Sequence, residues 1–316
     1  MKIILTDCAT LTYKNDVSLE CYKQIGEVVY YQGLTREELL SAVADTDIIL
    51  CNKTIIDKEV FDAAKKLKYI GLFATGYNNI DIEEARKRGV MVCNAGSYST
   101  NAVAQQTFAY ILAHYNALSN YDKFVKEGGW ITSATFSKLC FKTYELADKT
   151  IGIIGFGSIG RKVAQLALAF DMKVLVYTRT PRDCPDVEFV DFDTLLQKSD
   201  IVTVHCPLNP QSQGMFDNSA FNRMKDGAFF INTARGGVLN EQALFDALAS
   251  NKLSGAAVDV LAEEPMRSDC ILMNAPNITL TPHTAWAPIE TRERLIKIVY
   301  DNIQGFLSGN VINSVV

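Results

Sequence analysis

Short apolar runs alternate with helix-like stretches twice along this chain, and this alternation is the strongest constraint on its fold. In the first series, the runs are "KIILT", "EVVYY", "DIILC", "YIGLFA" and "VMVCN". The second series starts at "KTIGII" and continues through "KVLVY", "DIVTVHC", "GAFFINT", "SGAAVDV" and "NITLTPH". Such runs are typical of parallel sheets covered by helices. The pattern therefore predicts an α/β protein with two doubly wound parallel-sheet domains, which suits a length of 316 residues.

Local signals mark several helix boundaries. Thr35 followed by Glu38 fits a capping box, and Gly89 after "EARKR" fits a helix C-cap. A helical pattern covers residues 101–118, and an amphipathic helix over 290–309 ends the chain. The apolar face of this last helix carries Leu295, Val299, Ile303 and Phe306. These residues alone leave open whether the helix packs on the second domain or returns to the first.

Composition narrows the range of partners. Lysine and arginine total 31 against 36 aspartates and glutamates, which gives a formal net charge of −5, and the two signs are interspersed. We therefore expect neither nucleic acid nor an anionic membrane as a partner. No apolar run has the length of a signal peptide or a membrane span. The eight cysteines and three histidines are scattered, so we expect reduced thiols in the cytoplasm and no metal site.

A glycine motif opens the second series. Gly155, Gly157 and Gly160 in "GFGSIG" directly follow the apolar run "TIGII" and begin the helical stretch "RKVAQLALAF". In this context, the three glycines allow a tight turn, close approach of a pyrophosphate, and close packing of helix on strand. The backbone amides of Ser158 and Ile159 are then expected to face the phosphates of a dinucleotide.

The next strand, "KVLVY", ends without the acidic residue that usually binds the ribose of NAD. The segment "TRTPR" instead offers hydroxyl groups and positive charge from Thr178, Arg179, Thr180 and Arg182. A carboxylate at this place would repel a 2′-phosphate, whereas these side chains are suited to bind one. The sequence therefore predicts that NADPH is preferred, or at least tolerated.

Three later strands end in residues suited to catalysis. Arg235 follows "AFFINT", Asp259 and then Glu264 follow "GAAV", and His283 follows "ITLTP". Taken alone, Arg235 is typical of a surface residue, Glu264 of a solvated residue before proline, and His283 of a residue in a capped turn. Because ligands bind beyond the carboxyl ends of parallel strands, their ordered occurrence favours an active site with a fixed cation, an orienting carboxylate and a proton donor.

The blocks "NTARGGVLNEQAL", "GAAVDVLAEEP" and "TPHTAW" closely resemble the signature blocks of the D-isomer-specific 2-hydroxyacid dehydrogenase family. The resemblance covers essentially the whole chain. It implies a flavodoxin-like substrate domain of residues 1–98 plus 285–316, and a Rossmann cofactor domain of residues 99–284, separated by a cleft. It also places the terminal helix on the first domain and implies a homodimer built through the cofactor domains.

The same resemblance implies roles for individual residues. Protonated His283 would donate a proton to the carbonyl oxygen of a 2-keto acid, and Glu264 would orient its ring. Arg235 would hold the carboxylate and the carbonyl oxygen, with the backbone amides around Thr75 and Gly76 as a second clamp. Asp259 would face the nicotinamide carboxamide, and the remaining expected cofactor contacts are Thr100, Cys206, Pro207, Thr233 and Ala234.

The segments "ATGYNNID", "NKTIID" and "AWAP" resemble the glycerate dehydrogenase or hydroxypyruvate reductase branch. This implies reduction of hydroxypyruvate to D-glycerate, and of glyoxylate to glycolate. Lys53 would then lie near the substrate carboxylate or hydroxyl, with a solvated lysine as the alternative. Gln105 and Tyr77 depart from the common family pattern. His114 and His205 are interpreted as packing or cofactor-wall residues.

Other functions remain open at this stage. One is a related dehydrogenase with a different substrate, either a D-lactate-type 2-keto acid or phosphoglycerate; phosphoglycerate is less favoured, because no clear basic cluster accompanies the substrate loop. Another is a dinucleotide-sensing binding protein, similar to the transcriptional corepressors that share this fold. Turnover on hydroxypyruvate would distinguish an enzyme from such a binding protein.

Overall fold

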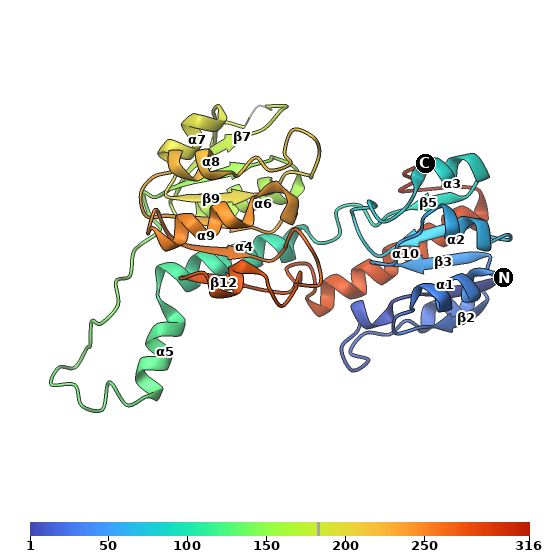
Figure 1. The fold of residues 1–316 in the computed structure, drawn as a ribbon, viewed down its shortest axis with the longest axis horizontal. Helices are drawn as coiled ribbons and strands as arrows, with labels where there is room; N and C mark the ends of the chain where they lie inside the picture. Colours follow the sequence, from blue (N-terminus) through green and yellow to red (C-terminus); the bar gives the residue numbers. More distant parts are fainter. Residues whose placement is uncertain (182–183) are drawn as a thin grey trace. The chain divides into compact units, whose positions relative to one another are not determined.

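The computed structural model describes residues 1–181 and 184–316, which form two compact units (Figure 1). One unit comprises Met1–Ser99 and Ala287–Val316, and the other comprises Thr100–Trp286. The family resemblance implies junctions after residues 98 and 284. Both units are α/β folds built on parallel sheets, which confirms the predicted fold class.

The first unit, all of whose residues are described, contains a five-stranded parallel sheet of order β2-β1-β3-β4-β5. The middle strands β3 and β4 are buried along their whole length, as expected for strands covered on both faces. The strands are β1 Lys2–Leu5, β2 Glu27–Tyr30, β3 Ile48–Cys51, β4 Tyr69–Leu72 and β5 Met91–Cys93. The helices are α1 Arg36–Val43, α2 Lys58–Ala63, α3 Ile82–Arg88 and α10 Ile289–Ser308.

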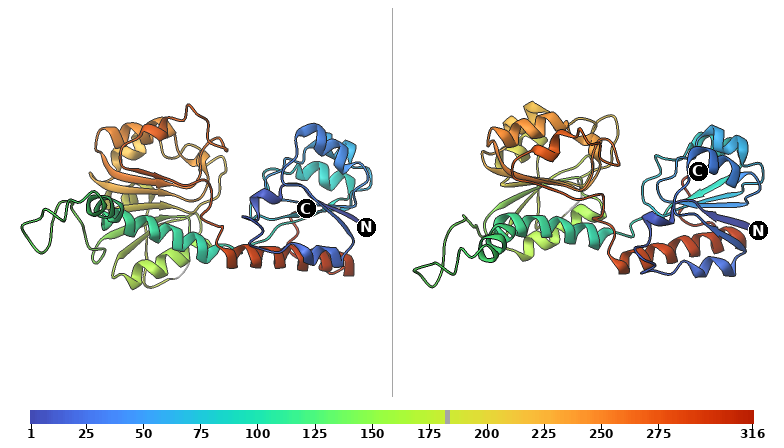
Figure 2. Two further views of the ribbon diagram at one scale, coloured as in Figure 1. Left: turned by 90° about the horizontal axis from the view of Figure 1, so that it is seen from below. Right: turned by 60° about the horizontal axis from the view of Figure 1, so that its bottom comes forward.

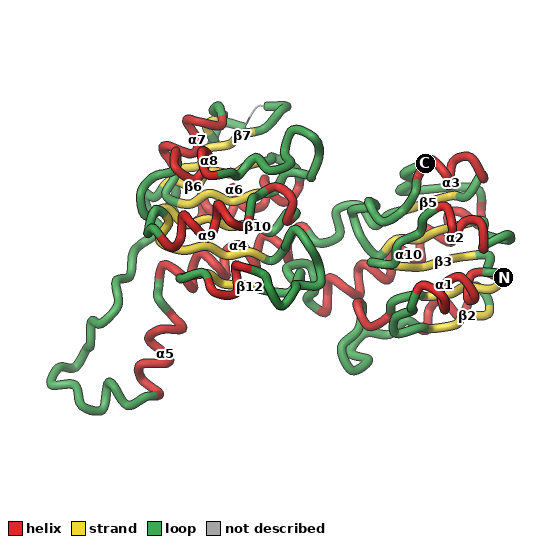
Figure 3. The backbone as a smooth tube through the Cα atoms, viewed as in Figure 1, coloured by secondary structure: helices red, strands yellow, loops and turns green. Residues whose placement is uncertain are grey.

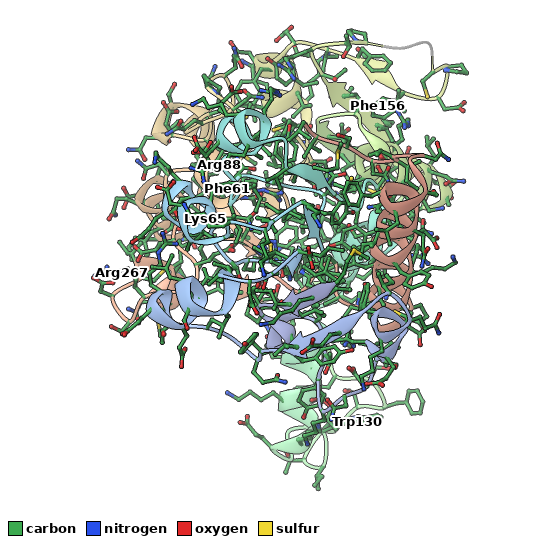
Figure 4. All side chains as sticks on the ribbon, turned by 90° about the vertical axis from the view of Figure 1, so that its right-hand side faces the viewer. Phe61, Lys65, Arg88, Trp130, Phe156 and Arg267 are labelled. Atoms are coloured by element: carbon green, nitrogen blue, oxygen red, sulfur yellow. The ribbon has the colours of Figure 1, made fainter. Side chains whose placement is uncertain are left out.

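Local signals act as predicted in this unit. Thr35 and Glu38 form a complete capping box, and Gly89 ends α3 in the left-handed conformation at φ +67°. Arg88 connects α3 to α2, since its guanidinium lies 5.9 Å from the ring centre of Phe61 and its Nη1 donates to the Phe61 carbonyl at 2.6 Å (Figure 4). These contacts are local in sequence or join neighbouring helices.

The terminal helix α10 packs on the sheet of the first unit, on the face opposite to α1, α2 and α3 (Figure 2). Its residues Leu295, Val299 and Ile303 are fully buried. The ring of Phe306 lies 4.9 Å from the ring of Tyr69 in β4. The apolar stripe therefore covers the first sheet, as the family resemblance implied.

The second unit contains a parallel sheet with seven strands among the described residues, in the order β12-β11-β10-β9-β6-β7-β8. The sequence predicted six. The additional strand, β8 Glu188–Phe189, has only two residues and is too short to produce an apolar pattern. The others are β6 Thr150–Ile154, β7 Lys173–Tyr177, β9 Ile201–Val204, β10 Ala228–Asn232, β11 Leu253–Val258 and β12 Ile278–Leu280. The helices are α4 Thr100–Tyr115, α5 Leu118–Lys126, α6 Ser158–Ala169, α7 Phe192–Lys198, α8 Asn218–Arg223 and α9 Glu241–Ala249.

Residues 118–145, which we call the arm, extend away from the sheet of the second unit (Figure 3). The sequence predicted no element for 121–144, yet the arm begins with helix α5, which has no buried residue. Large apolar side chains on the arm are exposed: Leu118, Val125, Trp130, Ile131, Phe136, Leu139 and Tyr144. Within the part of the chain described, no helix is both long and apolar enough to span a bilayer.

Candidate active site

The glycine loop between β6 and α6 is shaped by two steric requirements. Gly155 has φ +93°, and a Cβ at this position would lie 2.7 Å from the backbone nitrogen of Cys206. A Cβ on Gly160 would overlap the carbonyl of Gly155. By contrast, the space around Gly157 is open, so nothing in the chain itself requires glycine there. An open position at the N-terminus of a twelve-residue helix fits a phosphate-bearing ligand.

Two buried polar atoms also indicate a ligand beside this loop. Thr233 Oγ1 and His205 Nδ1 have no hydrogen-bond partner among the described residues. Because β10 pairs with β9, these residues follow adjacent strand ends. Burial lowers the pKa of His205 to about 3, so the ring is neutral, and its Nε2 lies 3.0 Å from Thr203 Oγ1. Buried polar groups are almost always paired, so a polar ligand group is expected here.

The segment after β7 lies near the same edge of the sheet. Gly155 N donates to the carbonyl of Tyr177, the last residue of β7, at 2.9 Å, so Arg179 follows shortly after a direct contact with the glycine loop. Burial raises the pKa of the Cys206 thiol, and the positive charge of Arg179 opposes that rise. Thr178 and Thr180 flank this arginine in sequence. Arg182, the other basic residue expected at this place, lies outside the described residues.

His283 and Glu264 form a direct pair. His283 Nδ1 donates to Glu264 Oε2 at 2.6 Å, since an ionised carboxylate can only accept. The other carboxylate oxygen, Oε1, accepts from the backbone nitrogen of Leu261 at 3.0 Å. The pair therefore places the proton of a neutral imidazole on Nδ1 and leaves Nε2 for chemistry.

Asp259 holds the backbone around His283. Its two carboxylate oxygens accept from the backbone nitrogens of Thr284 and Ala285, each at 2.9 Å, and from the hydroxyl of Thr281. The Asp259 carbonyl accepts from His283 N at 2.8 Å. His283 has φ +55°, a conformation uncommon outside glycine. Asp259 thus stabilises a strained turn, a role that sequence reasoning did not assign to it.

Asn232 shapes the turn that carries Arg235, and sequence reasoning missed it. Its Nδ2 donates to the Arg235 carbonyl at 2.9 Å, and its Oδ1 accepts from Ala234 N at 3.0 Å. Arg235 Nη1 donates to the Ala234 carbonyl at 2.7 Å. An asparagine ending the apolar run "AFFIN", fully buried in the structure, was the available signal.

Lys53 belongs to a loop of the first unit that Asp7 holds. The buried carboxylate of Asp7 accepts from the backbone nitrogens of Asn52 at 2.9 Å, Lys53 at 2.5 Å and Thr54 at 3.0 Å. Asn79 Nδ2 donates to the Thr54 carbonyl at 2.8 Å and so joins this loop to the one after β4. Asp7 was also missed, although an aspartate directly after "KIILT" was visible in the sequence.

Thr75 and Gly76 lie in the loop after β4, at the carboxyl edge of the first sheet. The Thr75 hydroxyl donates to the carbonyl of Gly96, and the Thr75 carbonyl accepts from Asn94 Nδ2 at 2.7 Å. The loop is therefore held by the segment that follows β5. His114, the remaining histidine, stacks on Phe229 at 4.1 Å and serves packing in the second unit.

Several known proteins are similar to this chain in both sequence and fold. Residues 108–285 match the family model described as "D-isomer specific 2-hydroxyacid dehydrogenase, NAD binding domain". A hydroxypyruvate reductase from Blautia hydrogenotrophica is 36% identical over 100% of this chain and 99% of its own length. A glyoxylate reductase from Thermofilum pendens is 38% identical over 93% of this chain and 89% of its own.

Two solved structures have a similar fold over the whole length of this chain. The TT0316 protein of Thermus thermophilus has a TM-score of 0.90 and 33% identity, and both chains are covered completely. An acyclic imino acid reductase in complex with NADPH and D-Arg has a TM-score of 0.88 and 31% identity, again over both whole chains. The family model and the glycine loop indicate a nicotinamide dinucleotide as cofactor. The chain belongs to the D-isomer specific 2-hydroxyacid dehydrogenase family.

Proposed function

We propose that this protein reduces hydroxypyruvate to D-glycerate, and glyoxylate to glycolate, with a nicotinamide dinucleotide as cofactor. The observation that carries the proposal is the 2.6 Å contact of His283 with Glu264, in the same unit as Arg235 and the glycine loop. The substrate assignment is supported by the relatives, which are named hydroxypyruvate reductase and glyoxylate reductase.

In this proposal, side chains of the protein donate the proton and bind the negatively charged groups of the substrate. The reduced nicotinamide, when bound, supplies the hydride that reaches C2 of the keto acid. His283 in its protonated form donates from Nε2 to the carbonyl oxygen, on which negative charge grows. Glu264 holds the ring through Nδ1 during this transfer. Arg235 binds the substrate carboxylate, because its planar guanidinium matches two oxygens at once.

The first unit is proposed to complete substrate binding. The backbone amides around Thr75 and Gly76 are assigned to the carboxylate, and Lys53 to the carboxylate or the 3-hydroxyl of hydroxypyruvate. The Asp7 carboxylate supports this assignment, since it holds three consecutive amides of the Lys53 loop. The cofactor contacts proposed in the second unit are Thr100, Gly155, Gly157, Ser158, Ile159, Gly160, Cys206, Pro207, Thr233, Ala234 and Asp259.

We assign the 2′-phosphate of NADPH to Thr178, Arg179 and Thr180. The position of this segment supports the assignment: it directly follows Tyr177, whose carbonyl accepts from Gly155 N at 2.9 Å, so its positive charge lies beside the glycine loop. The imino acid reductase solved with NADPH provides a second line of support. The protein is therefore expected to prefer NADPH over NADH.

We further propose a homodimer in the cytoplasm. The exposed apolar side chains of the arm, among them Phe136 at 93% and Leu139 at 89% exposure, support burial against a second copy. All eight cysteines are free thiols, which suits a reducing compartment.

A panel of 2-keto acids tests the main proposal by the consumption of NADPH. Hydroxypyruvate is expected to give the highest kcat/KM, followed by glyoxylate. The H283A variant should lower kcat by about 10²- to 10⁴-fold, the usual contribution of a general acid, with little change in the Kd of NADPH. Folded wild-type protein that binds NADPH but reduces none of these acids would refute the proposal and favour a binding protein.

A further inference from the structure

Gly236, directly after Arg235, is in backbone contact with the loop that leads to Glu264. It is buried, and a Cβ built on it would overlap the carbonyl of Leu261 and the backbone nitrogen of Ala262. Its φ does not lie in the left-handed region, so the need for glycine arises from space alone. The segment carrying Arg235 and the Leu261–Ala262 peptide are therefore packed backbone to backbone.

Leu261, whose carbonyl belongs to this peptide, also contacts the Glu264 carboxylate through its own backbone nitrogen. Leu261 N donates to Glu264 Oε1 at 3.0 Å, while Oε2 accepts from His283 at 2.6 Å. The next amide, Ala262 N, donates at 2.9 Å to Oε1 of Glu241, the first residue of α9. The peptide is thus held on one side by Gly236 and on another by Glu241.

The rest of the loop has little support from packing. An open hollow lies against it, lined by Leu261, Ala262, Glu263, Arg267, Asp269, Cys270 and Glu241. Ala262, Glu263 and Glu264 are themselves exposed. A methyl group added at position 236 would therefore overlap the backbone of a loop whose next residues are exposed.

We propose that Gly236 and Glu241 are positioning residues that together hold the Leu261–Ala262 peptide so that Glu264 meets His283. This inference rests on the proposed function for its kinetic consequence, whereas its structural consequence concerns the His283–Glu264 contact directly. The two glycines of "ARGG" then have different roles. A Cβ at Gly237 would meet only the flexible end of the Leu208 side chain, at 3.0 Å.

The test compares G236A with the matched variant G237A. Proteins labelled with ¹⁵N-histidine are examined by long-range ¹H–¹⁵N NMR at about pH 9, where an ordinary histidine is neutral. The spectrum of H283A identifies the His283 signals. In wild type and G237A, His283 should be the Nδ1–H tautomer that a carboxylate imposes. In G236A, this preference should be lost.

The kinetic outcome should parallel the tautomer. G236A is expected to lower kcat on hydroxypyruvate by about 10- to 100-fold, as small misplacements of catalytic groups do, with the Kd of NADPH within about twofold of wild type. For G237A, both kcat and the Kd of NADPH should stay within about twofold of the wild-type values. A G236A protein that retains both the tautomer and kcat would overturn the proposal.

Variants of Glu241 provide an independent readout. E241A removes the acceptor for Ala262 N and should reproduce the G236A effects, while E241Q keeps an acceptor oxygen and should restore most of kcat and the tautomer. If G236A does not fold, the two Glu241 variants test the proposal on their own. In that case, an E241A protein with the kcat and the His283 tautomer of wild type overturns the proposal. If wild type turns over no keto acid, the proposed function fails, and the tautomer still decides the positioning role.

Discussion

At the scale of single residues, charge pairs connect distant parts of the first unit. Arg292, near the start of α10, donates to both carboxylate oxygens of Asp16, at 2.7 and 2.6 Å, and to the Leu11 carbonyl at 3.0 Å. The hydrogen bonds from Arg292 lower the pKa of Asp16 from 3.8 to about 2. This contact ties the loop after β1 to the terminal helix.

The stability contributed by Asp16 should depend on pH. A folded-state pKa below the unfolded value stabilises the protein above the unfolded pKa, and this contribution is lost as pH falls through the folded pKa. D16N should therefore be less stable than wild type at neutral pH, and the difference should shrink between pH 3.8 and about 2. Urea unfolding across this pH range measures the difference in free energy of unfolding between D16N and wild type. A difference independent of pH would contradict the ion-pair explanation.

Arg179 should determine cofactor choice. R179D replaces a positive charge by the acid that usually binds a free ribose, so it should repel the 2′-phosphate and favour NADH. We expect the ratio of kcat/KM for NADPH over NADH to fall by at least about 10-fold. The control is R86D, at an exposed arginine on α3 of the first unit. An unchanged ratio in R179D would show that this side chain faces solvent.

At the scale of elements, two glycines at the junction of β6 and α6 differ in whether the fold itself requires them. Gly155 adopts φ +93° and lies against Cys206, whereas the space around Gly157 is open. The first glycine is thus required by the chain itself. We expect the second to be required only by the pyrophosphate of the proposed cofactor.

Two alanine variants should therefore behave differently. G155A is expected to lower the free energy of unfolding by about 1–3 kcal/mol or more, because of strain and overlap. G157A should unfold like wild type but bind NADPH at least about 10-fold more weakly. Urea unfolding and fluorescence titration measure the two effects. A G157A protein with normal NADPH affinity would exclude close approach of the pyrophosphate.

Elements were predictable from sequence where their signals are local. Apolar runs marked the long strands, and the residues Thr35, Glu38 and Gly89 marked helix ends, because capping involves near neighbours in the chain. Strand β8 and helix α5 were missed. The first has only two residues. The second is short, but its apolar residues Leu118, Tyr121 and Val125 stand at helical spacing, so the signal was present in the sequence and was overlooked.

At the scale of the whole molecule, the arm exposes large apolar side chains that we propose a second copy of the chain covers. Trp130 and Ile131 are 50% and 87% exposed, in a segment that extends from the second sheet (Figure 4). Replacing both by serine should convert a dimer into monomers, as measured by light scattering after size-exclusion chromatography. A control at Ser133 to alanine should leave the mass unchanged. A monomeric wild type would contradict the proposed dimer.

The sequence by itself determined the two sheets, the glycine loop, and which strand ends carry Arg235, Glu264 and His283, because strand and turn signals depend on residues close together in the chain. Only the tertiary structure showed how Asp7 and Gly236 act. Asp7 holds amides 52–54, and Gly236 contacts Leu261, so their partners are brought near by the pairing of parallel strands. Such contacts have no local pattern, since a parallel pair joins segments separated by a whole helix.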